Sequence, residues 1–236
     1  AYAANVLNIP EDELCDKIVP NLGFDRCGEK VIDYGDRTFK ITLNDDFTLS
    51  IYDNEKNKSI KSLPKPNEKD DKFKAESAKK EFTELKKQIK AVIKNQTERL
   101  ETVFRNKRTW NNGAWNNLFV ENPIMHIFAC KLIWGIFDEG KLIKSFRYME
   151  DGTFNTVDEE EYNIPDNSKI SLVHPCELNQ DEIEKWKMQL EDYEIVQPFD
   201  QINCEVAYLN EEDLDGKIIT KYTKYKSKVS SLLKIF

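Results

Sequence analysis

One stretch of the chain, residues 110–154, changes its hydrophobic period halfway along. Up to Lys131 the apolar residues recur at helical spacing, and beyond it they alternate between two turns that contain Gly140 and Gly152. Two short glycine turns in succession are typical of an antiparallel meander. The stretch also contains three of the four tryptophans. We therefore expect a helical hairpin followed by a β-meander at the centre of the fold, with Trp134 buried on the inner face.

The segments before this core contain a short helix, a hairpin and a long helix. Residues 9–19 have acidic side chains in a first helical turn, and residues 37–43 and 47–53 each alternate as paired strands do. Residues 71–106 contain no Gly or Pro, which favours one continuous helix. Its apolar stripe has nearly heptad spacing and lies opposite a Lys- and Glu-rich face. The stripe consists of Ala78, Phe82, Leu85, Ile89, Val92, Gln96, Leu100 and Val103.

The segments after the core predict a strand at residues 169–173, a helix at 180–193, a strand at 203–209 and a basic helix at 217–236. The fold class is therefore α+β: an N-terminal β-hairpin, a long amphipathic helix, a helical hairpin and an antiparallel β-meander with capping helices.

We interpret residues 1–236 as one α+β module. Its parts are a helix and hairpin (1–68), the long helix (69–108), the helical hairpin and meander core (109–209), and the basic helix (210–236). Because the first residues read as the tail of an earlier helix and the last helix has no cap, we expect a fragment truncated at both ends.

The amino-acid composition indicates which partners and which cellular compartment to expect. No apolar run approaches the roughly 18 residues of a membrane span, so no membrane partner is expected. Five cysteines without a CxxC pair indicate reduced thiols and a cytoplasmic location. The net charge of the chain is −8, but the charge is unevenly distributed. Residues 51–108 form a basic region with 17 basic and 10 acidic side chains. Since the rest of the chain is mostly acidic, nucleic acid is an unlikely partner.

The sequence contains no motif that identifies a reaction. The patterns GxxxxGK[ST], GxGxxG and HExxH are all missing. The two histidines each lie near a cysteine, as His126 with Cys130 and His174 with Cys176. These pairs could supply zinc ligands or a Cys/His nucleophile, but structural histidines and partly buried thiols are the simpler interpretation. We expect no catalytic residue, no metal and no cofactor.

Several segments resemble a known bacterial family. They are WNNLFVENPIMHIFACKLIWGIFDEGKLIKSFRYMEDGTF, LVHPCEL, DYEIVQPF, VIDYGDRTF and KSLPKPNEKDD. The chain resembles the C-terminal domain of unknown function of MolR-like (molybdate metabolism regulator-like) proteins. The resemblance implies a large multidomain bacterial protein, often with helical repeats upstream. The resemblance identifies no catalytic residue in this chain. Some proteins of the family carry a WGR module, but Trp134-Gly135-Ile136 is not its Trp-Gly-Arg signature, because the arginine is absent.

We therefore expect a non-catalytic interaction or regulatory module of a large multidomain bacterial cytoplasmic protein. Its partner would be the upstream helical region of the same protein or another protein, with a homodimer through the 78–103 stripe as an alternative. Two other functions stay open. One is an enzyme of unrecognised type whose site lies where the meander meets the His174-Pro175 and Gln197-Pro198 segments. The other is nucleic-acid binding through the Lys-rich helices.

The candidate binding residues come from the meander and the two proline segments. A pocket that joined His174, Arg147 and Gln197 would favour the enzyme, and a flat or apolar surface would favour the module. The candidates are Trp134, Arg147, His174, Glu177 and Gln197.

Overall fold

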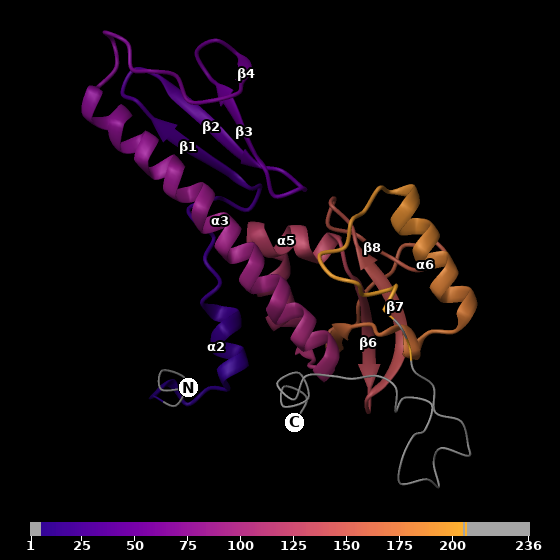
Figure 1. Ribbon diagram of the computed structural model, residues 1–236. Helices are drawn as coiled ribbons and strands as arrows, with labels where there is room; N and C mark the ends of the chain where they lie inside the picture. Colours follow the sequence, from indigo (N-terminus) through magenta and orange to yellow (C-terminus); the bar gives the residue numbers. More distant parts are fainter. Residues whose placement is uncertain (1–5, 205, 207–236) are drawn as a thin grey trace, which may run out of the picture.

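The computed structural model describes residues 6–204 and residue 206 (Figure 1). It contains helices and two antiparallel sheets, so the α+β prediction is confirmed. The predicted basic helix at 217–236, and the predicted strand at 203–209 for the most part, lie outside the described residues. No helix in the described part of the chain is both long enough and apolar enough to cross a membrane.

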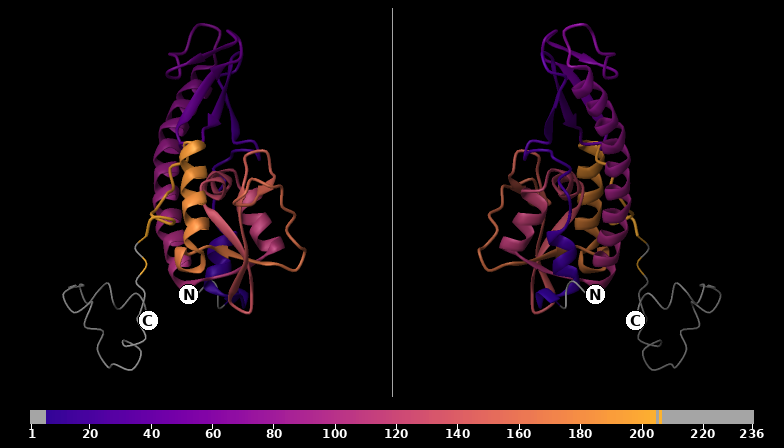
Figure 2. Two further views of the ribbon diagram at one scale, coloured as in Figure 1. Left: turned by 90° about the vertical axis from the view of Figure 1, so that its right-hand side faces the viewer. Right: turned by 90° about the vertical axis from the view of Figure 1, so that its left-hand side faces the viewer.

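A single helix, α3 (Lys72–Asn106), runs the length of the molecule (Figures 1 and 2). Its 35 residues correspond to about 52 Å at 1.5 Å per residue. Asp71 caps the first turn by accepting hydrogen bonds from the backbone N–H groups of Phe73 and Lys74, at 2.8 and 3.0 Å. Lys107 ends the helix in the left-handed conformation. The predicted bounds are thus confirmed.

The predicted stripe of α3 is buried within the chain. Its members are buried except Val92, which is half-buried, and Phe104 extends the stripe at the C-terminal end. Gln96 is also buried, and its carbonyl oxygen accepts a hydrogen bond from Arg99 Nε at 2.8 Å. Because the stripe is already covered by intramolecular contacts, a homodimer through it would have to displace them.

The N-terminal half of α3 lies beside a four-stranded sheet. The predicted hairpin corresponds to β2 (Thr38–Leu43) and β3 (Leu49–Asp53). Sequence reasoning missed the flanking strands β1 (Glu29–Asp33) and β4 (Lys58–Ile60), which are short and together contain one buried residue, Ile32. The order is β1-β2-β3-β4, antiparallel throughout.

The C-terminal half of α3 lies beside the second sheet, whose order is β5-β9-β6-β7-β8. The predicted meander is β6 (Ile133–Asp138), β7 (Lys141–Tyr148) and β8 (Phe154–Asn155). The strand β9 (Lys169–Leu172) pairs with β6 on the side away from β7, and β5 (Trp110–Asn111) completes that edge.

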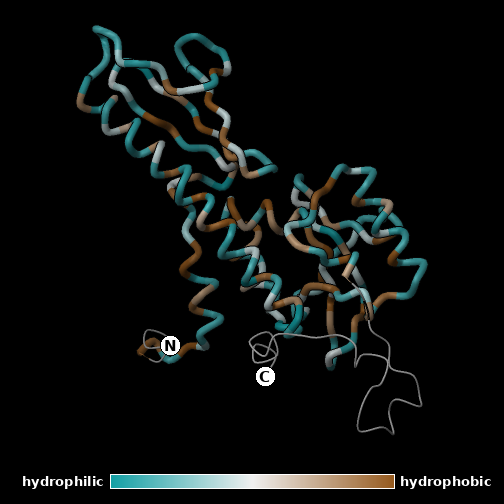
Figure 3. Tube along the Cα trace, viewed as in Figure 1, coloured by the Kyte–Doolittle hydropathy of each residue, from teal (hydrophilic) through white to brown (hydrophobic). Residues whose placement is uncertain are grey.

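Helices cover both faces of the second sheet (Figure 1). On one face lie the predicted helical hairpin and the end of α3. The hairpin consists of α4 (Asn112–Trp115), the π-helix η1 (Asn116–Val120) and α5 (Pro123–Cys130). On the other face lies α6 (Gln180–Asp192). Figure 3 shows why these helices can cover a core: α5 is mostly hydrophobic, whereas the longer α3 and α6 mix hydrophobic and hydrophilic positions.

Successive residues of β6 enter two different apolar clusters, because both faces of the strand are covered. Trp134 is fully buried, as predicted, and packs edge-on against Phe119 with ring centroids 4.7 Å apart. Its neighbour Ile133 packs with Trp186 of α6 in a second cluster. The whole segment from Ile133 to Phe137 is therefore buried.

A short N-terminal helix, α2 (Glu11–Lys17), is fixed to the end of α3 by one carboxylate. Asp16 accepts hydrogen bonds from Arg99 and Arg108 and, at 2.9 Å, from Trp110 Nε1. The arrangement ties α2, α3 and β5 together.

Gly135 provides a test of the close packing on the α6 face of β6. A Cβ atom at this position would lie 2.4 Å from Leu142 Cδ1 and 2.7 Å from Val173 Cγ2. We predict that Gly135→Ala destabilises the protein by about 1–3 kcal/mol, as overpacking of a core does. The measurement is the free energy of unfolding in urea.

The matched control is Gly113→Ala in α4, where the nearest atom to a new Cβ is Asn111 Oδ1 at 3.6 Å. This control should change stability little. Equal unfolding free energies for wild type and Gly135→Ala would mean that Leu142 of β7 and Val173, which follows β9, are not packed on Gly135 as described.

Candidate functional site

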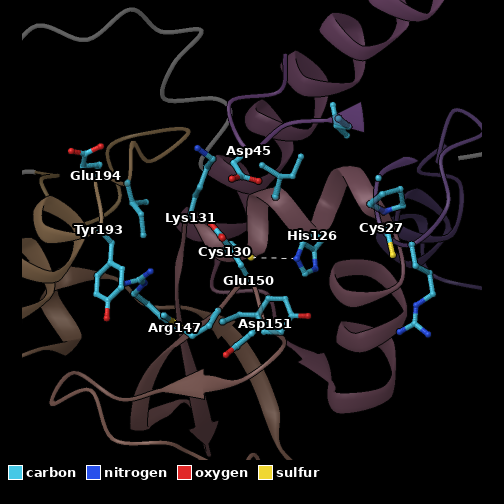
Figure 4. Close-up of a pocket in the computed structure, with 18 residues that line it drawn as sticks. Cys27, Asp45, His126, Cys130, Lys131, Arg147, Glu150, Asp151, Tyr193 and Glu194 are labelled. Atoms are coloured by element: carbon cyan, nitrogen blue, oxygen red, sulfur yellow. Dashed lines mark hydrogen bonds between the residues drawn. The ribbon is translucent and has the colours of Figure 1, made fainter. Parts of the chain in front are cut away.

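A cleft of about 810 Å³ opens at the end of the second sheet, where β7 ends (Figure 4). Both halves of the molecule line it. Cys27 and Asp45 come from the N-terminal segments, His126 and Cys130 from α5, and the 193–195 segment follows α6. The cleft therefore joins residues that are far apart in the sequence.

Arg147 lies at the inner side of this cleft and forms no ion pair in the described part of the chain, although the carboxylates of Glu150 and Glu159 are near enough to act on its pKa. Its side chain leaves β7 toward α6 and is only 3% exposed. Nη1 donates a hydrogen bond to Gln189 Oε1 at 3.3 Å, and the guanidinium stacks over the ring of Tyr193 with its carbon 4.8 Å from the centroid.

The guanidinium is incompletely satisfied by these contacts. Nε is buried and donates to no described protein atom. No carboxylate of the described residues forms an ion pair with this arginine, and burial lowers its pKa. A buried cation of this kind is costly unless something pairs with it.

Cys130 and His126 lie one helical turn apart on α5, with Sγ and Nε2 separated by 3.7 Å. Burial raises the pKa of the Cys130 thiol to about 12, and Glu150 and Asp45 act in the same direction. Burial also lowers the pKa of His126, which packs edge-on against Tyr148. Both groups are therefore neutral near pH 7, and Cys130 is not an activated nucleophile.

Four exposed carboxylates surround the opening of the cleft, together with two basic residues. Of the basic residues, Arg26 pairs with Glu121 at 2.8 Å, and Lys131 lies 6.0 Å from the centroid of the Phe47 ring. The carboxylates are Asp45, Glu150, Asp151 and Glu194. The outer part of the cleft is thus mainly acidic, and its one buried charge is positive.

His174 and Glu177 lie together, away from this cleft, at the C-terminal end of α3. They form a reciprocal cap for the short 3-10 helix η2 (Pro175–Glu177): His174 Nδ1 accepts from the N–H of Cys176, and Glu177 accepts from the N–H of His174. Glu177 also pairs with Lys107 at 2.8 Å, and the His174 ring stacks on Phe104. These contacts give both residues a structural role.

Gln197 lies outside both the cleft and the η2 cap. It belongs to a network of hydrogen bonds around Gln201, which we call the polar clamp. Gln197 Nε2 donates to Gln201 Oε1 at 2.9 Å. Gln201 in turn bonds the N–H and C=O of Ile133 and the C=O of Val173, at 2.9, 2.7 and 3.0 Å. The clamp holds the start of β6 against the end of β9.

Of the five sequence candidates, the structure brings only His174 and Glu177 together. Of the three residues considered for an enzymatic pocket, Arg147 lines the cleft, whereas His174 and Gln197 do not. Trp134 lies in the core with no exposed surface. Sequence reasoning missed Tyr193 and Gln189, since only the docking of α6 on β7 places them beside Arg147.

The zinc site that the sequence analysis considered would require the side chains of His126, Cys130, His174 and Cys176 to lie close together. The first two line the cleft, whereas His174 packs on Phe104 and its Nε2 lies 3.6 Å from Cys204 Sγ. Within residues 6–204 and 206, no group of three or more His, Cys, Asp or Glu side chains is placed to hold a metal ion.

Comparison with known proteins gives a family without an assigned function. Residues 58–236 match the model of a family described as "Domain of unknown function (DUF4132)". The chain is also similar to "Uncharacterized protein YehI" of Escherichia coli (strain K12), with 29% identity over 228 residues. That alignment covers 95% of this chain and 19% of the relative, so the chain spans about a fifth of the relative's length. No solved structure matches.

These comparisons correct the expected resemblance in part. A domain of unknown function is confirmed, but neither match links the chain to MolR-like proteins. Because the family model covers more than half of the residues, the chain belongs to the DUF4132 family.

Proposed function

We propose that this chain is a non-catalytic interaction module of a large bacterial cytoplasmic protein, and that the Arg147 cleft is its recognition site. The observation that supports this proposal is a buried arginine that forms no ion pair in the described part of the chain, inside a cleft whose buried thiol, Cys130, and imidazole, His126, are both neutral. Such a cleft offers a charge for recognition, and its buried thiol is not activated. All five cysteines are free thiols, which fits a reducing compartment.

The partner would be another region of the same protein or a second protein. The E. coli relative is much longer than this chain, which covers 19% of it. If the intact protein is similarly long, its other regions are held near the cleft at high effective concentration. A regulatory role would follow if such a contact were made and released.

The alternatives have weaker support. His174, Glu177 and Gln197, around which an enzyme site was considered, are engaged in capping and clamping the local backbone. Two of the eight lysines of α3 form ion pairs, Lys74 with Asp33 at 2.8 Å and Lys87 with Glu84 at 3.4 Å. No described residue gives a specific reason to prefer nucleic acid.

The neutral state of Cys130 can be tested by alkylation. A thiol with a pKa of about 12 in place of the usual 9.0 carries about a thousandfold less thiolate at pH 8, so we predict that iodoacetamide leaves Cys130 unmodified in the folded protein. The exposed Cys27 should react and serves as the internal control. Peptide mass spectrometry reads both sites, before and after unfolding in urea. Alkylation of folded Cys130 at the rate of Cys27 would contradict the non-catalytic interpretation.

Photo-crosslinking tests whether the cleft contacts a partner. The full-length protein would carry a photoreactive amino acid in place of Glu194, which is exposed at the cleft, or in place of Glu68, which is exposed in the loop before α3. We predict that irradiation in cells gives a defined adduct from position 194 and not from position 68. The attached peptide, identified by mass spectrometry, shows whether the partner is another region or another protein. The proposal fails if position 194 gives no adduct, or gives the same unspecific products as position 68.

A further inference from the structure

We infer that the Arg147 cleft binds a carboxylate that is carried by a protein segment with basic neighbours. This inference rests on the proposed function and names the chemistry of the partner. It is supported by the geometry of the guanidinium, the character of the surrounding surface and the volume of the cleft.

The guanidinium presents an unused edge. Among the described residues it makes one hydrogen bond, from Nη1 to Gln189, while Nε has no partner. The ring of Tyr193 lies 4.8 Å from the guanidinium carbon, and this cation–π contact supplies no oxygen or nitrogen acceptor for the N–H donors. The Nε–Nη2 edge is the fork that pairs with the two oxygens of a carboxylate.

Tyr193 is suited to be the movable part of this site. It is the C-cap residue of α6 and is 47% exposed, although its ring lies on a buried cation. Because Nε is buried, a carboxylate oxygen reaches it only when a neighbouring side chain moves, and Tyr193 is an exposed neighbour of the guanidinium. A half-exposed side chain at a helix end can make that movement without unfolding the helix.

The acidic surroundings select the kind of carboxylate. Asp45, Glu150, Asp151 and Glu194 are exposed at the opening, so they would repel a dianion such as phosphate. A single carboxylate with lysine or arginine on each side would place its negative charge on Arg147 and its positive charges near these four acids. The cleft volume of about 810 Å³ is sufficient for a side chain together with its neighbours.

The test uses the 236-residue chain and three tripeptides that are blocked at both ends: Lys-Glu-Lys, Lys-Gln-Lys and Ala-Glu-Ala. Binding is followed by NMR at the Arg147 Nε–H group, whose signal should shift when a carboxylate accepts its proton. We predict saturable shifts with Lys-Glu-Lys, weaker binding of Ala-Glu-Ala and no shift with Lys-Gln-Lys. Arg147→Met should weaken Lys-Glu-Lys binding about tenfold or more, measured by calorimetry, because a charged hydrogen-bonded pair is lost.

Two further variants act as controls. Arg26→Met removes another arginine of the cleft, one that is exposed and paired with Glu121, and should leave binding unchanged. Arg147→Lys keeps the charge without the fork and should also bind weakly, which separates bidentate pairing from simple attraction. Circular dichroism establishes that each variant is folded.

Several results would overturn the inference. They are equal binding of Lys-Gln-Lys, undiminished binding by folded Arg147→Lys, or tighter binding of inorganic phosphate. Binding of 4-aminobutyrate as tight as that of Lys-Glu-Lys would show that the cleft is a small-molecule site. It would contradict the inference that a protein segment carries the carboxylate.

Failure of the inference can be distinguished from failure of the proposed function. Crosslinking from position 194 that persists in the Arg147→Met variant would uphold the module and refute the carboxylate. Binding of Lys-Glu-Lys without any crosslink from position 194 would uphold the recognition of a carboxylate and refute the interaction module.

Discussion

The packing of one uninterrupted helix against two separate sheets is the constraint on which this structure depends. The N-terminal half of α3 buries apolar side chains such as Phe82 and Leu85 beside the four-stranded sheet. The C-terminal half does the same with Leu100 and Phe104 beside the five-stranded sheet. Each fully buried aliphatic or aromatic side chain contributes about 1.5–3 kcal/mol, so both ends of the helix are firmly held. A rigid helix then fixes the distance between the sheets.

The candidate site is a consequence of that arrangement. Its N-terminal side is formed by the segments around Cys27 and Asp45, and its C-terminal side by α5, the end of β7 and the residues after α6. The cleft would be lost if the two halves moved independently. The same rigidity allows Arg147 to be held beside Tyr193 with no ion pair to the described residues, since a more mobile framework would let a nearby carboxylate neutralise it.

The sequence was informative wherever a feature depends on local periodicity. The bounds of α3 follow from an apolar stripe without Gly or Pro, and the β6–β7–β8 meander follows from turns at Gly140 and Gly152. The missed strands β1 and β4 have few buried residues to set a period. The pairing of β9 with β6 could not be predicted, because register between distant strands leaves no local pattern.

In the candidate site, too, the sequence identified a single residue but not the distant segments that surround it. Arg147 was identified as a candidate, but its proposed neighbours, His174 and Gln197, belong to a helix cap and a backbone clamp. Its actual neighbours come from α6, whose position on β7 depends on apolar contacts that are far apart in the sequence. The sequence therefore identified the charged residue, and only tertiary packing could show that its Nε donates to no atom of the described residues.

Native-state hydrogen exchange in increasing urea tests most directly whether α3 joins the two halves into one folding unit. The slowest amides of β2 in the first sheet and of β6 in the second should exchange through the same global opening. They should therefore give the same free energy and the same dependence on urea. The account is contradicted if the β2 amides exchange through a separate, smaller opening of much lower free energy while β6 stays protected. The two sheets would then fold independently, and α3 would not hold the cleft together.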